Sequence, residues 1–351
     1  MGSGRRRYRI AVIEGDGIGP EIVAASVAVL RAAAAGFGFG LDLQYVPAGA
    51  GEYRRRGAAI SPAGLAAVRD ADATLKGPVG LPEVRLSDGT EAGVLGGILR
   101  GGLDLYANVR PVRLLPGAPT RLDARPGDID YVIIRENTEG LYAARGKGVG
   151  GGWAVADTMI ITRPASMRIA RFAFEFAVRR AAAAGNRSPA VTCVDKANVL
   201  RGMYLFREVF QEVASGFPDV RAECLHVDAA AQALVVEPER FDVLVTENMF
   251  GDILSDLGGG TVGGIALCPG ANIGDEGAYF EPIHGSAPSL AGTGTRTQSA
   301  RSWRPRCCST TSVKPGPVTP SAPPSATRWL AAPSSCRGPV PSAAGPPGPP
   351  P

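Results

Sequence analysis

Residues 9–21 read Arg9-Ile-Ala-Val-Ile13-Glu-Gly15-Asp-Gly-Ile-Gly19-Pro20-Glu21, and this stretch decides the class of fold. Residues 10–13 are apolar and mostly β-branched, as in a buried strand, and Pro20 then opens an apolar-periodic segment, residues 22–34, that is typical of a helix. A strand, a glycine loop and a helix in this order begin an α/β fold. The glycines follow G-x-G-x-G-P, so the third comes one residue too early for the G-x-G-x-x-G dinucleotide fingerprint. We therefore predict an α/β fold that is not a Rossmann domain.

Strand-like and helix-like segments continue to alternate along the chain. Residues 131–134 and 243–245 are short apolar runs typical of buried strands. Residues 166–184 have helical periodicity, with phenylalanines on one stripe that fits a core better than a cofactor site. The alternation extends the α/β prediction to about residue 295.

The composition fits an enzyme of ordinary globular type. The 351 residues are 45% apolar and 20% charged, enough for two domains or one large α/β unit. Six cysteines occur without Cys-x-x-Cys spacing, which predicts neither a disulfide framework nor a zinc site. The basic N-terminus has no apolar signal-peptide core after it, and no run approaches the ~20 apolar residues of a membrane span. We predict a cytoplasmic protein with no membrane partner.

The last part of the chain, residues 296–351, differs from the rest. It contains six Arg, one Lys, 14 of the 30 prolines and no acidic residue, so residues 1–295 are mildly acidic despite the net charge of +4. Such a segment buries too little apolar surface to offset its ordering entropy, and we predict that it is a disordered tail. It lacks the compact basic runs and interleaved aromatics of a nucleic-acid-binding arm, so no nucleic-acid partner is predicted.

Two aspartates, Asp252 and Asp256, lie four residues apart in Asn248-Met-Phe-Gly-Asp-Ile-Leu-Ser-Asp256. At helical spacing both carboxylates leave the same face of one turn. Two like charges held this close favour a cation between them, and hard oxygen ligands suit Mg²⁺ or Mn²⁺. The alternative interpretation is a solvated helix face with two unrelated acids.

Cationic and proton-transferring side chains occur near the ends of other predicted strands. Arg100, Arg110 and Arg135 have the fork geometry that binds carboxylates through paired hydrogen bonds. Tyr142 and Lys196 are candidates for proton transfer, provided that neighbouring charges lower their pKa values. Each residue alone fits a structural role equally well, and only their combination indicates a site.

The motifs together resemble those of the metal-dependent β-decarboxylating dehydrogenases, the family of isocitrate, 3-isopropylmalate, tartrate and D-malate dehydrogenases. The resemblance covers residues 8 to about 295 and rests on residues 14–21, 106–111, 135–142, 248–256 and 281–288. It implies an isopropylmalate-dehydrogenase-like three-layer fold with two domains around a central sheet. Residues 1–105 and 263–295 would form the cofactor-binding domain, and residues 106–262 the substrate, metal and dimerisation domain.

The resemblance also implies a site shared between two subunits. Lys196 of the partner subunit would accept the hydroxyl proton of a malate-type 2-hydroxy acid during its oxidation, and Tyr142 would protonate the enolate left by decarboxylation. A homodimer would therefore be the active form. The implied substrate-carboxylate ligands are Arg100, Arg110 and Arg135. The implied ligands of Mg²⁺ or Mn²⁺ are Asp252, Asp256 and, from the partner subunit, Asp228. The implied cofactor-binding residues are Asn198, Glu281, His284, Gly285, Ser286, Ala287 and Ser289.

Two departures from the family pattern bear on specificity. Ser289 stands where NAD users carry Asp and NADP users often carry Lys, which favours NAD without excluding NADP. Gly96 and Gly97 stand where isopropylmalate enzymes carry Leu, and the Ser and Asn of isocitrate enzymes are also missing nearby. Residues 110–117 resemble the tartrate and D-malate branch. The substrate therefore stays open among 3-isopropylmalate, D-malate and tartrate.

The segment from Thr295 to Lys314 stands where the family has Ala-Asn-Pro followed by a long apolar helix. Back-translated with GC-rich codons and read from the third base of the Thr295 codon, it becomes Ala-Asn-Pro-Val-Gly-Ala-Ile-Leu-Ala-Ala-Ala-Met-Leu-Leu-Asp-His-Leu-Gly-Glu. We interpret this agreement as a frameshift that has replaced the last helices of the cofactor domain. The alternative function is therefore that of a catalytically impaired or regulatory family member.

Overall fold

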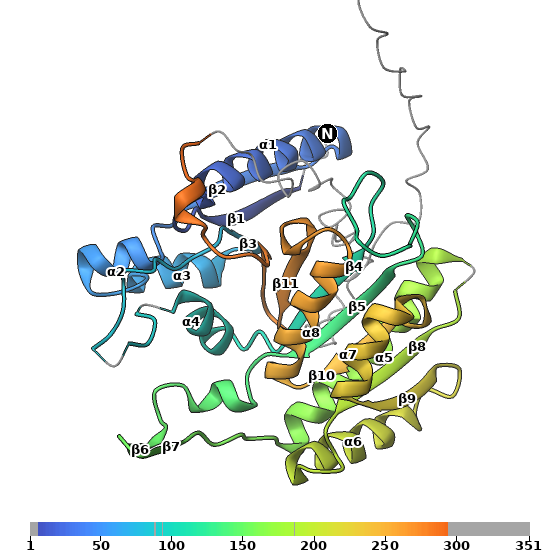
Figure 1. The fold of residues 1–351 in the computed structure, drawn as a ribbon. Helices are drawn as coiled ribbons and strands as arrows, with labels where there is room; N and C mark the ends of the chain where they lie inside the picture. Colours follow the sequence, from blue (N-terminus) through green and yellow to red (C-terminus); the bar gives the residue numbers. More distant parts are fainter. Residues whose placement is uncertain (1–5, 88, 93, 186, 294–351) are drawn as a thin grey trace, which may run out of the picture.

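One ten-stranded sheet runs through the computed structural model, which describes residues 6–87, 89–92, 94–185 and 187–293 (Figure 1). The strand order is β2-β1-β3-β12-β11-β4-β5-β10-β8-β9. The strands of the sheet are β1 (Arg7–Ile13), β2 (Gly40–Tyr45), β3 (Ala73–Lys76), β4 (Ala107–Arg113), β5 (Asp130–Glu136), β8 (Ala190–Asp195), β9 (Arg221–His226), β10 (Val243–Thr246), β11 (Pro269–Ile273) and β12 (Ala278–Pro282). The helices are α1 (Gly19–Phe37), α2 (Ala50–Arg56), α3 (Pro62–Asp70), α4 (Leu95–Gly102), α5 (Arg163–Ala184), α6 (Arg201–Ala214), α7 (Val227–Val236) and α8 (Asn248–Thr261). A separate hairpin pairs β6 (Val149–Gly151) with β7 (Ala154–Ala156).

The sheet is mixed, which confirms the α/β prediction and the exclusion of a Rossmann sheet. Strands at both ends pair in parallel, as β1 does with β2 and β3, and as β8 does with β9 and β10. In the middle, β11 runs antiparallel to both β12 and β4, and β4 runs antiparallel to β5. The predicted strands at residues 131–134 and 243–245 are β5 and β10.

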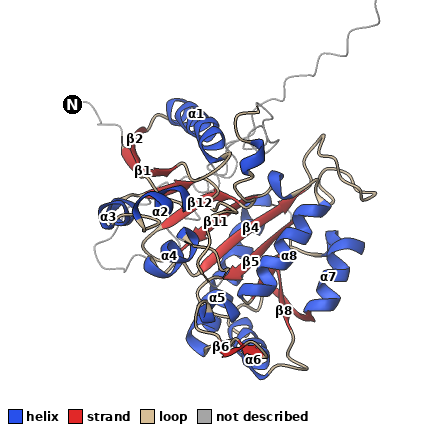
Figure 2. Cartoon of the chain, turned by 60° about the vertical axis from the view of Figure 1, so that its left-hand side comes forward, coloured by secondary structure: helices blue, strands red, loops and turns tan. Residues whose placement is uncertain are grey.

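Helices cover both faces of the sheet, as Figure 2 shows, so the fold has the predicted three layers. Alternate residues of one strand point to opposite faces. In β5, Val132 and Ile134 pack in the core beneath α5 and α6, whereas Tyr131 and Ile133 pack in the core beneath α7 and α8. The phenylalanines of α5 belong to the first of these cores, as the sequence predicts.

The strand order fits a discontinuous first domain. Strand β12 lies beside β3, and β11 links β12 to β4, so residues 269–282 complete the half of the sheet that residues 7–76 begin. The division into residues 1–105 with 263–295 and residues 106–262 agrees with this order and stays a prediction. The tail predicted to be disordered, residues 296–351, lies outside the described residues.

Helix α1 is long and apolar enough to cross a membrane by length and composition, contrary to the prediction that no apolar run approaches this length. A core helix of a soluble protein can have the same length and composition. One face of α1 packs on the sheet, where Val23 and Val27 join Val12 and Leu75 in a small core. Much of the rest of the helix is exposed, because only 28% of its most apolar 18-residue stretch is buried.

The glycine loop between β1 and α1 holds the first turn of α2 and the loop after β3 in place. Gly15 and Gly17 have φ values of +77° and +57°, a backbone conformation that residues with a side chain rarely adopt. A Cβ at Gly15 would lie 2.1 Å from the carbonyl oxygen of Pro78. Between these glycines the Asp16 carboxylate accepts hydrogen bonds of 2.8 Å from the backbone N–H groups of Ala50, Gly51 and Gly80. The motif that begins the fold therefore also connects the start of α2 to the loop after β3 through hydrogen bonds to Asp16.

We predict that Gly15→Ala lowers the free energy of unfolding by about 2 kcal/mol or more, because it adds left-handed strain and a backbone clash. Gly36→Ala is the matched control, since Gly36 lies within α1 and its added methyl group meets open space. It should stabilise the protein by about 0.5–1 kcal/mol. Urea unfolding of both variants measures the contrast, and equal stabilities would contradict this account of the loop.

Candidate active site

Helix α8 lies close against β4 and β5 because glycines face the sheet. A Cβ at Gly251 would lie 2.6 Å from the Cβ of Arg135, and one at Gly258 would lie 2.5 Å from the Tyr131 hydroxyl. The helix begins at Asn248, directly after β10 and Glu247, whose side chain accepts from the Phe250 N–H. This close approach brings the acidic face of α8 over the arginines of the two strands.

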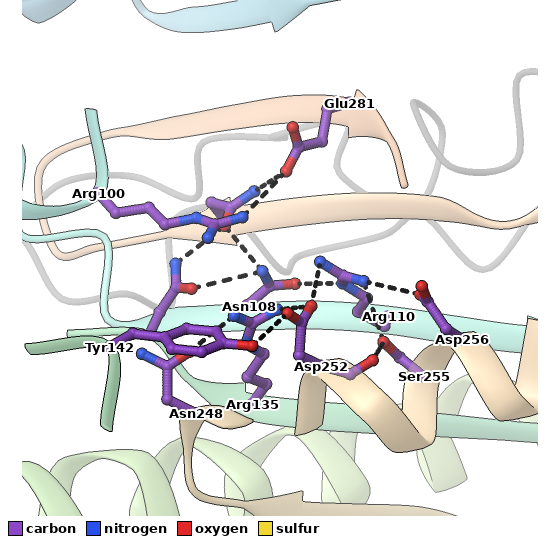
Figure 3. A network of polar contacts seen from close by, with 12 residues as sticks. Arg100, Asn108, Arg110, Arg135, Tyr142, Asn248, Asp252, Ser255, Asp256 and Glu281 are labelled. Atoms are coloured by element: carbon purple, nitrogen blue, oxygen red, sulfur yellow. Dashed lines mark hydrogen bonds and ion pairs between the residues drawn. The ribbon is translucent and has the colours of Figure 1, made fainter. Parts of the chain in front are cut away.

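Asp252 is the meeting point of Arg135 and Tyr142 (Figure 3). The Arg135 guanidinium donates to Asp252 Oδ1 through Nη1, and the Tyr142 hydroxyl donates to Asp252 Oδ2 at 3.0 Å. Arg135 also donates through Nε and Nη2 to Asn248 Oδ1, at 2.9 and 2.7 Å. The guanidinium carbon lies 5.5 Å from the Tyr142 ring centroid, a cation–π distance. These contacts fix the predicted tyrosine beside the predicted aspartate.

Arg110 connects both aspartates. Its Nη2 lies 3.7 Å from Asp252 Oδ1, and its Nη1 lies 3.5 Å from Asp256 Oδ1. Nη1 also donates to Ser255 Oγ at 2.9 Å, and Nε donates to Asn108 Oδ1 at 3.0 Å. The prediction that both aspartates lie on one helix is therefore confirmed. Because both lie close to Arg110, they are not two unrelated acids on a solvated face.

Burial and charge perturb the titration of the whole group. Burial lowers the pKa of Arg135 to about 10, and the neighbouring arginines act in the same direction. Burial opposes ionisation of Asp252, but Arg135 and Arg110 outweigh it and lower the pKa of this carboxyl. Burial raises the pKa of Asp256, and Asp252 adds to the effect. Burial and Asp252 also raise the pKa of Tyr142, opposite to the expected lowering.

Arg100 lies in a second cluster, beside the first, that is centred on Glu281. The Glu281 carboxylate pairs with Lys76 Nζ at 2.6 Å and with Arg100 Nη2 at 3.5 Å, and it accepts from Asn272 Nδ2 at 2.9 Å. Burial disfavours ionisation of Glu281, but Lys76 and then Arg100 lower its pKa to about 2. Arg100 also donates to the Tyr279 hydroxyl at 3.0 Å. The Glu281 carboxylate thus has partners within the protein, and its expected role at the cofactor stays a prediction.

Lys196 and Asp228 form a pair of their own. Lys196 follows the last residue of β8, Asp228 lies in the first turn of α7, and Lys196 Nζ donates to Asp228 Oδ1 at 2.7 Å. This hydrogen bond lowers the pKa of Asp228. Within the described residues, no hydrogen bond or ion pair joins this pair to Asp252 or Asp256. The chain by itself therefore supplies two of the three expected metal ligands at one place.

The loop expected at the cofactor, residues 284–289, is anchored to the glycine loop. The Ser286 hydroxyl donates to the Gly80 carbonyl, and the Ile18 N–H donates to the Ser286 carbonyl at 2.8 Å. Ala287 has a φ of +39°, unusual for a residue with a side chain. Gly285 and Ser289 are exposed, and His284 Nδ1 lies 2.8 Å from the Gly285 carbonyl oxygen. Asn198 is exposed in the turn after β8, a separate element.

The donor set around α8 fits a divalent cation. Asp252 and Asp256 offer hard oxygen atoms one helical turn apart, and both side chains are partly exposed, at 36% and 53%. Among the described residues, no cluster of three ligands includes both of them, and a third ligand from the partner subunit stays a prediction.

Sequence reasoning missed the residues that join the two clusters. Asn272 Oδ1 accepts from Asn108, Asn137 and Arg100, while its amide donates to Glu281. Lys76 was missed as well, although a lysine that closes a run of apolar strand residues is a sign of a buried ion pair. The signal that could have identified these residues is a polar side chain within a strand, such as Asn108, which lies two residues before Arg110.

Comparison with known proteins identifies the same family that the sequence motifs resemble. Residues 9–301 match the family described as isocitrate/isopropylmalate dehydrogenase. The Methanocaldococcus jannaschii protein named 3-isopropylmalate/3-methylmalate dehydrogenase is 45% identical over 81% of this chain and 80% of its own. The 3-isopropylmalate dehydrogenase of Methanothermobacter thermautotrophicus is 43% identical over 82% and 80%. The crystal structure of isocitrate dehydrogenase from Methylococcus capsulatus is similar with a TM-score of 0.73 at 38% identity, covering 84% of this chain and 83% of that one.

The mixed sheet, with arginines and carboxylates converging where β4, β5 and α8 meet, defines a β-decarboxylating dehydrogenase. The chain belongs to the isocitrate/isopropylmalate dehydrogenase family. Its sequence resemblance to that family is thereby confirmed.

The Glu281 cluster predicts a pH dependence of stability. Because the folded pKa of about 2 lies below the ordinary 4.5, the ionised form contributes about 3 kcal/mol above pH 4.5, and this is lost as pH falls from 4.5 towards 2. Urea unfolding between pH 7 and 3 should show Glu281→Gln less stable at pH 7, with the difference shrinking as the pH falls. Glu239→Gln, at an exposed position, is the control. A pH-independent difference would contradict the assignment.

Proposed function

We propose that the chain catalyses the NAD-dependent oxidative decarboxylation of a malate-type 2-hydroxy acid with Mg²⁺ or Mn²⁺, and that 3-isopropylmalate is the first substrate to test. The observation that carries the proposal is the convergence of Arg110, Arg135 and Tyr142 on the carboxylates of Asp252 and Asp256. The names of the curated relatives support the choice of acid. We expect the enzyme to work in the cytoplasm.

The arginines bind and orient the substrate. Arg110 and Arg135 are buried and held by Asn108, Asn248 and Ser255, so their forks keep one orientation, and a carboxylate that enters meets donors already in place. Arg100, partly exposed beside Glu281, supplies a third cation at the edge of the site.

Lys196 and Tyr142 carry the two proton transfers. The Lys196 amine accepts the hydroxyl proton of the substrate. A bound nicotinamide would supply the hydride acceptor for this oxidation. After the β-carboxylate leaves as carbon dioxide, the Tyr142 hydroxyl donates a proton to the carbon that carried it. A divalent cation held by Asp252 and Asp256 would supply Lewis-acid polarisation of the substrate oxygens.

Specificity depends on two small features. The exposed Ser289 neither repels nor attracts a ribose 2′-phosphate, and we favour NAD with NADP as the second cofactor to test. Side-chain atoms added at Gly96 would meet open space on α4, and those at Gly97 would meet Arg145 at 3.7 Å. This uncovered surface accommodates a 3-alkyl group without a specific contact, so D-malate and tartrate belong in the same assay.

A homodimer with shared sites is part of the proposal. The Lys196–Asp228 pair is separate from the Asp252 cluster of its own chain, and the hairpin of β6 and β7 presents Val149, Trp153 and Val155 to solvent. An exposed apolar hairpin of this kind favours contact with a second subunit. A twofold axis would bring the pair of one subunit to the acidic cluster of the other.

Mixed dimers test the shared site. Tyr142→Phe and Lys196→Met should each lower turnover at least ~100-fold because each removes a proton-transfer group. After mixing, unfolding and refolding, half of the dimers pair one variant with the other and contain one intact site of two, so about one quarter of the activity should return. The doubly substituted chain, refolded with either single variant, is the control and should restore none. Heterodimers that form without regaining turnover would contradict sharing.

A second candidate, a catalytically impaired family member, is favoured by the surroundings of α1. Phe37 of α1 and Tyr45 of β2 are 58% and 51% exposed although both are large and apolar. The described chain ends beside this helix, where the Gly292 N–H donates to Glu21 at 2.7 Å. An apolar helix after residue 293 would cover the exposed face, and the shifted reading frame, with GC-rich codons, would encode one.

Turnover of two chains separates the candidates. Two chains are compared: the chain as given, and one in which the sequence after Thr295 is replaced by that of the shifted reading frame (the restored chain). Each is mixed with Mn²⁺, with NAD or NADP, and with each acid in turn. The absorbance of the reduced cofactor measures turnover. The proposed function predicts turnover with 3-isopropylmalate by both chains. The impaired candidate predicts turnover by the restored chain and loss of most of it in the chain as given. No turnover by the restored chain with any acid would contradict the proposed activity, and equal turnover would contradict the impairment. Sequencing the DNA around codon 295 tests the frameshift itself.

A further inference from the structure

Two cysteines lie together outside the candidate active site, on the last two strands of the sheet. Cys193 of β8 and Cys224 of β9 are partners in the parallel register of these strands. Register partners point to the same face, and neighbouring strands lie about 4.8 Å apart. Both cysteines are free, Cys193 is buried and Cys224 is partly exposed. The two sulfurs and one carboxylate oxygen of Asp195 all lie within 4.8 Å of one another.

A guanidinium covers this cluster. Arg207 of α6 donates through Nε and Nη2 to both Asp195 oxygens, at 2.7 and 2.8 Å, and the Ala197 N–H donates to the same carboxylate at 2.8 Å. A metal ion on Asp195 would have to displace Arg207 from its two hydrogen bonds. The cation therefore disfavours a bound metal, and it favours a negatively charged sulfur against the opposing charge of Asp195.

The two thiols differ in the way that a reactive pair requires. The neighbouring Cys193 thiol lowers the pKa of Cys224, partial burial opposes this, Arg207 lowers it further, and Asp195 opposes the effect of Arg207. The Cys193 thiol itself lies 3.7 Å from Asp195 Oδ2, to which it donates. Burial raises the pKa of Cys193 well above its ordinary value. The partly exposed sulfur is therefore the one with thiolate character, which is the nucleophilic form. The buried thiol lies beside it to complete a second step.

We propose that Cys224 and Cys193 form a peroxide-reactive dithiol that closes to a reversible disulfide. The Cys224 thiolate attacks one peroxide oxygen, the O–O bond breaks, and sulfenic acid and hydroxide form. The Cys193 sulfur then attacks the Cys224 sulfur, gives up its proton and releases the second oxygen as water. Two cysteines lose one electron each and the peroxide gains two. The strand spacing lies within the 4.4–6.8 Å Cα range of disulfides.

Peptide mapping of the full chain tests the proposal, because trypsin separates the cysteines. Cys193 lies in the peptide of residues 188–196 and Cys224 in that of residues 222–240. After treatment with an equimolar amount of hydrogen peroxide and alkylation, mass spectrometry should find these two peptides linked, and dithiothreitol should release them. Cys193→Ser should lose the link and allow dimedone, a sulfenic-acid trap, to label Cys224. Cys224→Ser should lose both signals.

Cys268→Ser is the matched control, since Cys268 is buried elsewhere and the variant should keep the link at its full yield. Circular dichroism verifies that each variant is folded. Recovery of both peptides alkylated and unlinked, with no dimedone on Cys224, would overturn the proposal. One zinc ion per chain in the purified protein, released when these thiols are modified, would also overturn it in favour of a metal site. Neither readout depends on turnover, so failure here is distinct from failure of the proposed activity.

Discussion

The ion pair between Arg135 and Asp252 is the interaction on which the candidate site depends. A buried arginine is costly unless its charge and its donors are satisfied, and here Asp252 and Asn248 satisfy both. The pair forms because Gly251 lets α8 lie directly on β5. With α8 held there, Asp256 follows one turn later within reach of Arg110. One close helix–strand contact thus positions the cations and carboxylates together.

The second cluster acts as a support for the first. The Lys76–Glu281 pair joins β3 to β12, and Asn272 transmits this order to Asn108, next to Arg110 along the same face of β4. The two halves of the sheet are connected by hydrogen bonds between side chains as well as by the strand ladder. The internal ion pairs of Glu281 therefore give it a structural role, and its predicted contact with the cofactor stays a prediction.

Local elements were largely predictable from the sequence. The β1 strand, the α1 helix and the α8 helix follow from apolar periodicity and from residues such as Pro20, since these signals lie within one segment. The partners of Glu281 were not predictable, because Lys76 is 205 residues away and meets it only when β3 and β12 become neighbours. The raised pKa of Tyr142 was missed for a similar reason, since it depends on burial and on the facing Asp252.

The central claim is that a divalent ion binds at Asp252 and Asp256 in a folded dimer. Titration of Mn²⁺ into the protein, followed by calorimetry, tests it most directly, with Asp256→Asn as the site variant and Asp219→Asn, at an exposed position, as the control. The account predicts saturable uptake by the unaltered protein and the control, weakened at least ~10-fold in Asp256→Asn because one of the hard oxygen ligands is lost. Circular dichroism and a sizing measurement would establish that each sample is a folded dimer. Equal uptake by all three proteins, or none by the folded, unaltered dimer, would contradict the account.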